Sequence, residues 1–164
     1  MSSSPSNWIA AHVALGSNLG DREGTLRRAV ALLRRPDIRV RTVSRFIETQ
    51  PVGPSGQEPY LNGAAELETT LGPHALLDVL MDVERQLGRD RSREQRWGAR
   101  TCDLDLLLVG PTVLDTPNLT LPHPRMHERR FVLEPLADIA PHTTHPILGK
   151  TISQLLHDLG TKTT

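Results

Sequence analysis

The sequence has very few cysteine and aromatic residues and no excess of charge of one sign. One cysteine, Cys102, excludes a disulfide within the chain and fits a reducing compartment, so we expect the cytoplasm. Lys plus Arg and Asp plus Glu balance at 19 each, so no net charge attracts nucleic acid or an anionic membrane. No apolar run approaches the roughly 18 residues of a membrane span. We therefore expect neither nucleic acid nor a membrane as a partner.

The composition is that of a small globular protein. Hydrophobic residues make up 37% of the 164 residues and charged residues 23%, which is ordinary for a folded domain of this length. Residues 1–7 lack the basic start and apolar centre of a signal peptide, and we expect a disordered tail there. We expect residues 8–164 to form a single domain that acts as a monomer.

The periodicity of apolar residues predicts an α+β domain with the element order β-α-β-β-α-β. The predicted strands span residues 9–15, 38–48, 61–71 and 103–109. One predicted helix is capped by Asp21 and ends before Pro36, and the other begins near Pro73 and stops at Gly88. This order is typical of a ferredoxin-like sandwich. A C-terminal extension should follow, with a hairpin near residues 110–121 and helices over residues 132–139 and 152–159.

Two carboxylates open the last strand of this series, in Asp103-Leu104-Asp105. Side chains alternate along a strand, so Asp103 and Asp105 should project from one face while Cys102 and Leu104 point to the other. Adjacent like charges are costly unless a cation offsets them, and Mg²⁺ held by one or two carboxylates completes its shell with substrate phosphates. The other interpretation is a strand end with two solvated acids paired to arginines. The short motif does not decide between them.

Six arginines lie within residues 85–100, directly before the acid pair. They are Arg85, Arg89, Arg91, Arg93, Arg96 and Arg100. Such a cluster is either a solvated face or a mobile loop that carries guanidinium groups to a polyphosphate. Trp97 and Gly98 lie next to the acid pair and favour the second interpretation, a mobile loop that carries guanidinium groups to a polyphosphate.

Other features have mainly structural interpretations. Residues 16–20 contain two glycines but lack the lysine of a P-loop, which predicts a turn into the first helix. His123 and His127 have no third ligand at zinc spacing. Tyr60 by itself is typical of core or turn packing, and only its place in the motif of residues 59–62 favours a role in binding.

Together the motifs resemble the 6-hydroxymethyl-7,8-dihydropterin pyrophosphokinases of folate biosynthesis. They span residues 14–21, 48–53, 59–62, 84–89, 96–105 and 121–136. Each motif could arise by chance, whereas all of them in this order make coincidence implausible. The resemblance implies a ferredoxin-like kinase that moves diphosphate from ATP to the hydroxymethyl group of a reduced pterin and releases AMP.

The resemblance also implies roles for individual residues. Asp103 and Asp105 would bind two Mg²⁺ ions that bridge the ATP phosphates and the acceptor oxygen, with Arg89 and Arg100 facing the phosphates. The residues that match ATP-contacting positions are Glu84, Arg91, Trp97, Leu106, Leu119, Thr120, His123 and Arg129. The residues that match pterin-binding positions are Thr49, Val52, Tyr60, Asn62 and Phe131, with Tyr60 and Phe131 on opposite faces of the ring.

The chain departs from the family pattern in three places. Ala99 stands where the family often has proline, and Met81 occupies a helix position that is polar in some members. The segment between Gly88 and Trp97 is one residue longer, which leaves the register of Arg91, Arg93 and Arg96 open. Two other functions compete. A ferredoxin-like RNA-binding module would carry aromatic residues on its central strands and a basic sheet face, and the sequence predicts neither. A different Mg²⁺-dependent phosphotransferase on the same scaffold would not need a pterin pocket.

Overall fold

The structure is a computed structural model that describes residues 7–49, 59–88 and 102–161. Its elements are β1 (Ile9–Ser17), α1 (Arg22–Leu33), β2 (Ile38–Val43), β3 (Ile47–Thr49), β4 (Tyr60–Thr69), α2 (Pro73–Gln86), β5 (Asp103–Val109), β6 (Leu114–Asp115), β7 (Thr120–Leu121), a 3-10 turn (Met126–Glu128), α3 (Arg130–Ile139) and α4 (Ile152–Thr161). With β2 and β3 taken together as the one strand predicted over residues 38–48, this order confirms the predicted β-α-β-β-α-β core, the hairpin and the two C-terminal helices. Among the described residues, no helix has the length and apolar character needed to cross a membrane.

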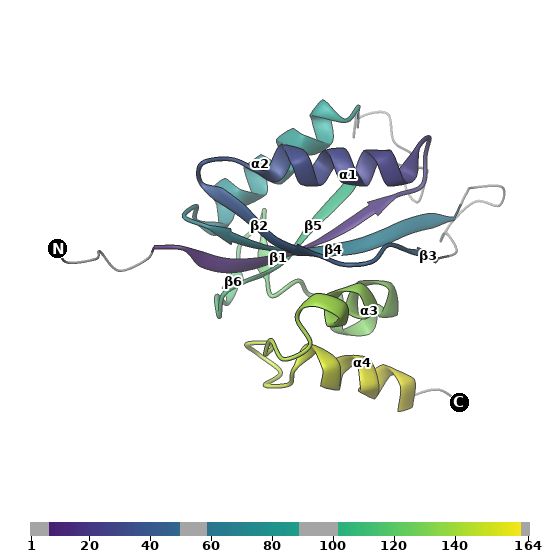
Figure 1. The fold of residues 1–164 in the computed structure, drawn as a ribbon. Coiled ribbons are helices and arrows are strands. Elements are labelled where there is room, and N and C mark those ends of the chain that lie inside the picture. Colours follow the sequence, from purple (N-terminus) through teal and green to yellow (C-terminus); the bar gives the residue numbers. More distant parts are fainter. Residues whose placement is uncertain (1–6, 50–58, 89–101, 162–164) are drawn as a thin grey trace.

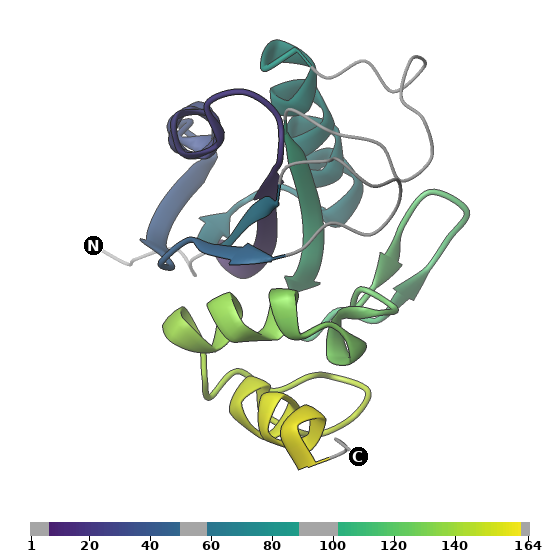
Figure 2. The same cartoon turned by 90° about the vertical axis from the view of Figure 1, so that its right-hand side faces the viewer.

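One antiparallel sheet forms the centre of the molecule. Its strands follow the order β2-β4-β1-β5, and β3 also pairs with β4. The strand β1 pairs with β4 on one side and with β5 on the other, so β5 lies at an edge of this sheet. Helices α1 and α2 cover one face and α3 covers the other (Figure 1). Figure 2 shows α3 between the sheet and α4. The arrangement is the ferredoxin-like sandwich with a helical extension on its second face.

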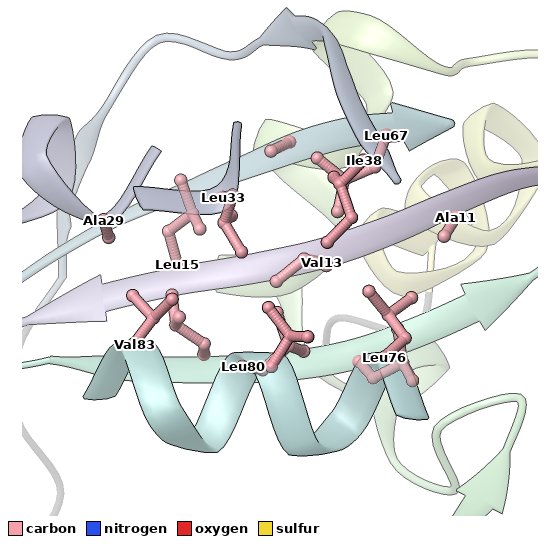
Figure 3. Close-up of a cluster of buried hydrophobic side chains, with 14 of the residues drawn as sticks. Ala11, Val13, Leu15, Ala29, Leu33, Ile38, Leu67, Leu76, Leu80 and Val83 are labelled. Carbon is pink, nitrogen blue, oxygen red and sulfur yellow. The ribbon is translucent and has the colours of Figure 1, made fainter. Parts of the chain in front are cut away.

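The two faces of the sheet bury two separate apolar clusters. The first cluster, under α1 and α2, includes alternate residues of β1 and residues at helical spacing on α2, as Figure 3 shows: Ala11, Val13, Leu15, Leu76, Leu80 and Val83. The cluster under α3 contains the intervening residue Ala14 together with Ala64 of β4. Strand alternation therefore assigns successive residues to opposite layers.

The segment predicted as one strand over residues 38–48 is divided in the structure, which corrects that prediction. Between β2 and β3, the Ser44 hydroxyl accepts a hydrogen bond from the Ala64 N–H at 2.8 Å. A Cβ at Gly63 would lie 2.7 Å from the Phe46 ring, and Phe46 packs against the cluster under α1 and α2. The interruption depends on contacts with β4, which residue periodicity does not reveal. The next strand also differs slightly, since β4 spans residues 60–69 and not 61–71.

Candidate active site

Three neighbouring strands bring Asn62, Gly16 and Asp103 into one row across the sheet. Gly16 of β1 lies opposite Asn62 of β4 on one side and opposite Asp103 of β5 on the other. Paired residues of an antiparallel sheet share a face. This face is the one that carries Ala14 and Ala64, which α3 covers further along the strands. The row therefore lies at the end of the sheet where β1 finishes and β4 and β5 begin.

Gly16 leaves the centre of this row without a side chain. A Cβ at this position would lie 3.4 Å from Asn62 Oδ1, 3.8 Å from Tyr60 Cδ1 and 3.9 Å from Asp103 Cβ. Gly16 is not among the glycines with a positive φ, so the backbone does not require glycine here. A Cβ here would already make ordinary van der Waals contacts with all three neighbours, so glycine leaves the room of about one methyl group between them. Asn62, Tyr60 and Asp103 surround this area. We call it the Gly16 floor.

Gly16 is the residue that sequence reasoning misplaced. The run of residues 16–20 predicted a turn, whereas β1 continues to Ser17 and Gly16 is paired on both sides. The partners of a central strand depend on the register of two antiparallel pairings. The hydrophobic pattern indicates which face each residue takes, but it does not tell which residues of two strands distant in sequence lie opposite each other.

Asp105 lies on the same face as Asp103, as the alternation predicted. It lies opposite Ala14 of β1, and both aspartates are half-buried. Cys102 and Leu104 are buried in the cluster on the other face. Two partly buried carboxylates on one strand face have the hard oxygen chemistry that Mg²⁺ prefers. The donor set therefore fits a magnesium ion.

Strand β3 contributes Thr49, one of the residues predicted to bind a pterin. Thr49 lies opposite Tyr60 in the register of β3 and β4. The Asn62 side-chain amide donates a hydrogen bond to the Thr49 hydroxyl, and Asn62 is 7% exposed. This bond uses one of the two amide N–H groups and orients the side chain, and Asn62 Oδ1 is the atom that faces the Gly16 floor. An oriented carbonyl oxygen of this kind can accept a hydrogen bond from a ligand.

The segment that leads into α3 contributes His123, Arg129 and Phe131. The His123 backbone N–H donates to the Leu107 carbonyl oxygen at 2.9 Å, which holds His123 beside β5. The Arg129 guanidinium carbon lies 5.7 Å from the centre of the Phe131 ring. Phe131 is 38% exposed, so it offers an aromatic face at the start of α3. A guanidinium, an imidazole and an aromatic ring thus come from one short segment.

His123 is an uncharged hydrogen-bond donor at neutral pH. Burial lowers its pKa, and the charge of Arg129 lowers it further, while Asp103 opposes the shift. His123 Nδ1 accepts a hydrogen bond from the Arg125 N–H at 3.1 Å. The proton of the neutral ring is then on Nε2. His123 can therefore donate from Nε2 without adding a charge to the site.

Glu84, at the end of α2, holds the free edge of β5. Its Oε2 accepts a hydrogen bond from the Leu104 N–H at 2.8 Å, and Glu84 is 2% exposed. Leu104 lies between Asp103 and Asp105, so this bond fixes the backbone that carries both aspartates. Alternate residues of an edge strand direct their backbone groups outward. Leu106, whose side chain is buried in the first cluster, should therefore present its N–H and C=O to the same edge.

Replacing Glu84 by leucine is expected to lower the free energy of unfolding by about 1–3 kcal/mol, because the buried Leu104 N–H loses its acceptor. Glu84→Gln should cost less, since the amide oxygen can still accept. Urea denaturation measures both, with Asp78→Leu, at an exposed position of α2, as the matched control. If Glu84→Leu is no less stable than Asp78→Leu, Glu84 does not hold β5.

The hairpin of β6 and β7 borders β5 as well. Leu119 is buried in the first cluster, whereas Thr120 is half-buried and its hydroxyl donates to Asp115 Oδ1 at 3.2 Å. The structure therefore brings the hairpin, Glu84 and the backbone of Leu106 to one side of the sheet. Other predicted site residues lie outside the described part of the chain: Val52, Arg89, Arg91, Trp97 and Arg100.

Comparison with known sequences identifies a family match over most of the chain. The family model described as 7,8-dihydro-6-hydroxymethylpterin-pyrophosphokinase (HPPK) matches residues 12–141. The chain is 52% identical over 130 residues to the 2-amino-4-hydroxy-6-hydroxymethyldihydropteridine pyrophosphokinase of Bacillus subtilis, covering 79% of this chain and 77% of that protein. It is 44% identical over 146 residues to the protein of the same name from Pseudomonas aeruginosa, covering 88% of each.

Solved structures agree on the fold. The crystal structure of Plasmodium falciparum HPPK-DHPS with pterin and p-hydroxybenzoate superposes with a TM-score of 0.72 over 98% of this chain, at 15% sequence identity. The chain spans 43% of the length of that structure. At this identity the likeness supports the ferredoxin-like architecture alone.

Proposed function

Because the chain belongs to the 7,8-dihydro-6-hydroxymethylpterin-pyrophosphokinase family, we propose that the Gly16 floor is where it carries out the family reaction. That reaction is the transfer of diphosphate from ATP to 6-hydroxymethyl-7,8-dihydropterin in folate biosynthesis, which gives the pterin diphosphate and AMP. One observation supports the location most strongly. Asn62, Tyr60 and Asp103 converge around Gly16, so an oriented amide, an aromatic ring and the side chain of an aspartate start from one small area.

The pterin would lie on the side of Asn62. A flat heteroaromatic ring needs aromatic faces and a few fixed polar groups. Tyr60 and Phe131 would supply the faces, and Asn62 Oδ1 would accept a hydrogen bond from the edge of the ring. The hydroxyl of Thr49 keeps the Asn62 amide in this orientation. By resemblance, the backbone around Thr49 and Val52 would read the remaining edge.

The phosphates of ATP would lie on the side of Asp103. Family members use ATP with Mg²⁺, and we propose that Asp103 and Asp105 hold two ions. Mg²⁺ bound there would offset the charge of the phosphates. His123 would donate from Nε2 to a phosphate oxygen, and Arg129, which lies near enough to lower the pKa of His123, would add a positive charge. By resemblance, Arg89, Arg91, Trp97 and Arg100 complete this side.

The nucleoside would lie along the edge of β5. The outward N–H and C=O of Leu106 can form a pair of hydrogen bonds with an adenine ring. Glu84, Leu119 and Thr120 border the same edge and would contact the ribose and the base. Glu84 would then act in two ways, since its carboxylate also holds the Leu104 N–H.

The chemistry asks mainly for positioning and charge stabilisation. The hydroxymethyl oxygen of the pterin attacks the β-phosphorus of ATP, its proton is lost, and the bond between the α-phosphate and the β-phosphorus breaks. We propose that a monomer is active. We propose the cytoplasm as its location, where the buried thiol of Cys102 stays reduced.

Incubation with ATP, Mg²⁺ and 6-hydroxymethyl-7,8-dihydropterin is expected to produce AMP and pterin diphosphate in equal amounts. Attack on the β-phosphorus transfers both terminal phosphates, so ADP should not accumulate. Phosphorus NMR of the reaction mixture measures both nucleotides, and a sample without pterin serves as the control. ADP as the main nucleotide product would contradict the proposed reaction.

A further inference from the structure

Arg22, the first residue of α1, joins the two chain segments that present Thr49 and Tyr60. Its Nη1 donates to the carbonyl oxygen of Pro59 at 2.8 Å, and its Nη2 donates to Glu48 Oε1 at 2.6 Å. Glu48 precedes Thr49 on β3, and Pro59 precedes Tyr60 at the start of β4. One guanidinium therefore bridges both segments directly beside the Thr49 and Tyr60 pair.

Within the described residues, backbone pairing at this end of the sheet stops close to Tyr60, since β1 pairs with β4 only as far as Ser17 opposite Leu61. The pairing of β3 with β4 comprises three residue pairs, and Thr49 with Tyr60 is the last of them. Pro59 comes next and has no N–H, so it cannot donate a further ladder hydrogen bond. Arg22 holds Pro59 by its carbonyl oxygen instead. The Arg22 side chain is 27% exposed, so the guanidinium is partly shielded, and a charged donor makes a stronger bond than a neutral one.

The turn before α1 determines where Arg22 lies. Gly20 has a φ of +71°, a conformation that favours glycine. The Asp21 carboxylate then accepts a hydrogen bond from the Gly24 N–H at 3.0 Å and caps the helix. These two features fix the first turn of α1, and with it the Cα of Arg22. The motif of residues 16–21 thus has an effect beyond forming a turn, because it directs a guanidinium to β3 and β4.

We propose that Arg22 is a positioning residue for the pterin. By bridging Pro59 and Glu48, it holds the Thr49 and Tyr60 pair in place. Thr49 accepts the hydrogen bond that orients the Asn62 amide, so the effect of Arg22 reaches the atom that faces the Gly16 floor. This inference rests on the proposed function. It assigns Arg22 to the pterin side of the site and not to the ATP side.

The test compares Arg22→Ala and Arg22→Lys with Arg28→Ala, a change at an exposed position of the same helix. Calorimetric titration measures the Kd of 6-hydroxymethyl-7,8-dihydropterin with Mg²⁺ and a non-hydrolysable ATP analogue present, and separately the Kd of the analogue. Arg22→Ala is expected to raise the pterin Kd about tenfold, because the loss of both charge-assisted hydrogen bonds leaves the Thr49 and Tyr60 pair less firmly held. The Kd of the analogue should stay within about twofold. Lysine can make one of the two contacts, so the pterin Kd of Arg22→Lys should lie between those of Arg22→Ala and the unmodified protein.

Steady-state rates and melting temperatures distinguish positioning from a general loss of structure. The KM for pterin should rise more than kcat falls, and the melting temperature of Arg22→Lys should match that of Arg28→Ala within a few degrees. Equal changes in the affinities for both ligands, or a pterin Kd like that of Arg28→Ala, would overturn the inference. The proposed function fails separately, if the unmodified protein releases no AMP. If Arg22→Ala does not fold, Arg22→Lys and Glu48→Gln still test the bridge, and pterin affinities equal to that of the unmodified protein in both would overturn it.

Discussion

Replacing Asp103 or Asp105 by asparagine is expected to reduce turnover about a thousandfold or more, the loss expected when a metal or a comparable charge-stabilising contact is removed. Asparagine keeps the shape of the side chain but removes the charge that would hold Mg²⁺. The two carboxylates share one strand face, so removing one relieves repulsion. The melting temperature without metal should therefore not fall.

Initial rates of AMP release at saturating ATP and pterin measure this effect. Asp78→Asn, an exposed aspartate on α2, is the matched control and should retain full activity. The titration of Mg²⁺ should show weaker activation in both strand variants. A variant at either position that keeps more than about a tenth of the turnover would mean that the acid pair does not hold the metal.

Replacing Gly16 by valine is expected to lower kcat/KM about a hundredfold while the protein remains folded. The valine methyl groups would occupy the Gly16 floor between Asn62 Oδ1, Tyr60 and Asp103, whose atoms lie 3.4–3.9 Å from the position of a Cβ. A displacement of about 1 Å between reacting groups costs on the order of a hundredfold in rate. Valine is favoured in strands, so the melting temperature should not fall.

Gly16→Ala should have a smaller effect, because a single methyl group would make ordinary van der Waals contacts at these distances. Ala10→Val introduces the same side chain at an exposed position of β1 and should leave kcat/KM unchanged. Steady-state rates with each substrate varied measure all three. Full activity of Gly16→Val would mean that neither substrate occupies the area around Gly16.

The order of elements and the faces of Asp103 and Asp105 could be predicted because they depend on local periodicity. Apolar residues at helical or alternating spacing identify each element by itself. The break between β2 and β3 could not be predicted in this way. It depends on the bond from the Ala64 N–H to the Ser44 hydroxyl and on the Phe46 ring over Gly63, which are contacts with another strand.

The candidate site was predicted residue by residue from the resemblance, but its assembly was not. The meeting of Asn62 and Asp103 at Gly16 depends on the register of β1 with both of its neighbours. The contact of Glu84 with the Leu104 N–H depends on how α2 packs against β5. Both contacts depend on tertiary packing. A motif can name such residues without indicating which atoms face each other.

Paramagnetic relaxation tests most directly whether the pterin and the metal share the Gly16 floor. With Mn²⁺ in place of Mg²⁺ and a non-hydrolysable ATP analogue bound, the proton resonances of added 6-hydroxymethyl-7,8-dihydropterin should broaden strongly, the hydroxymethyl protons most of all. Asp103→Asn should abolish the broadening at the same Mn²⁺ concentration. Pterin that binds without broadening in the unmodified protein would contradict the shared site.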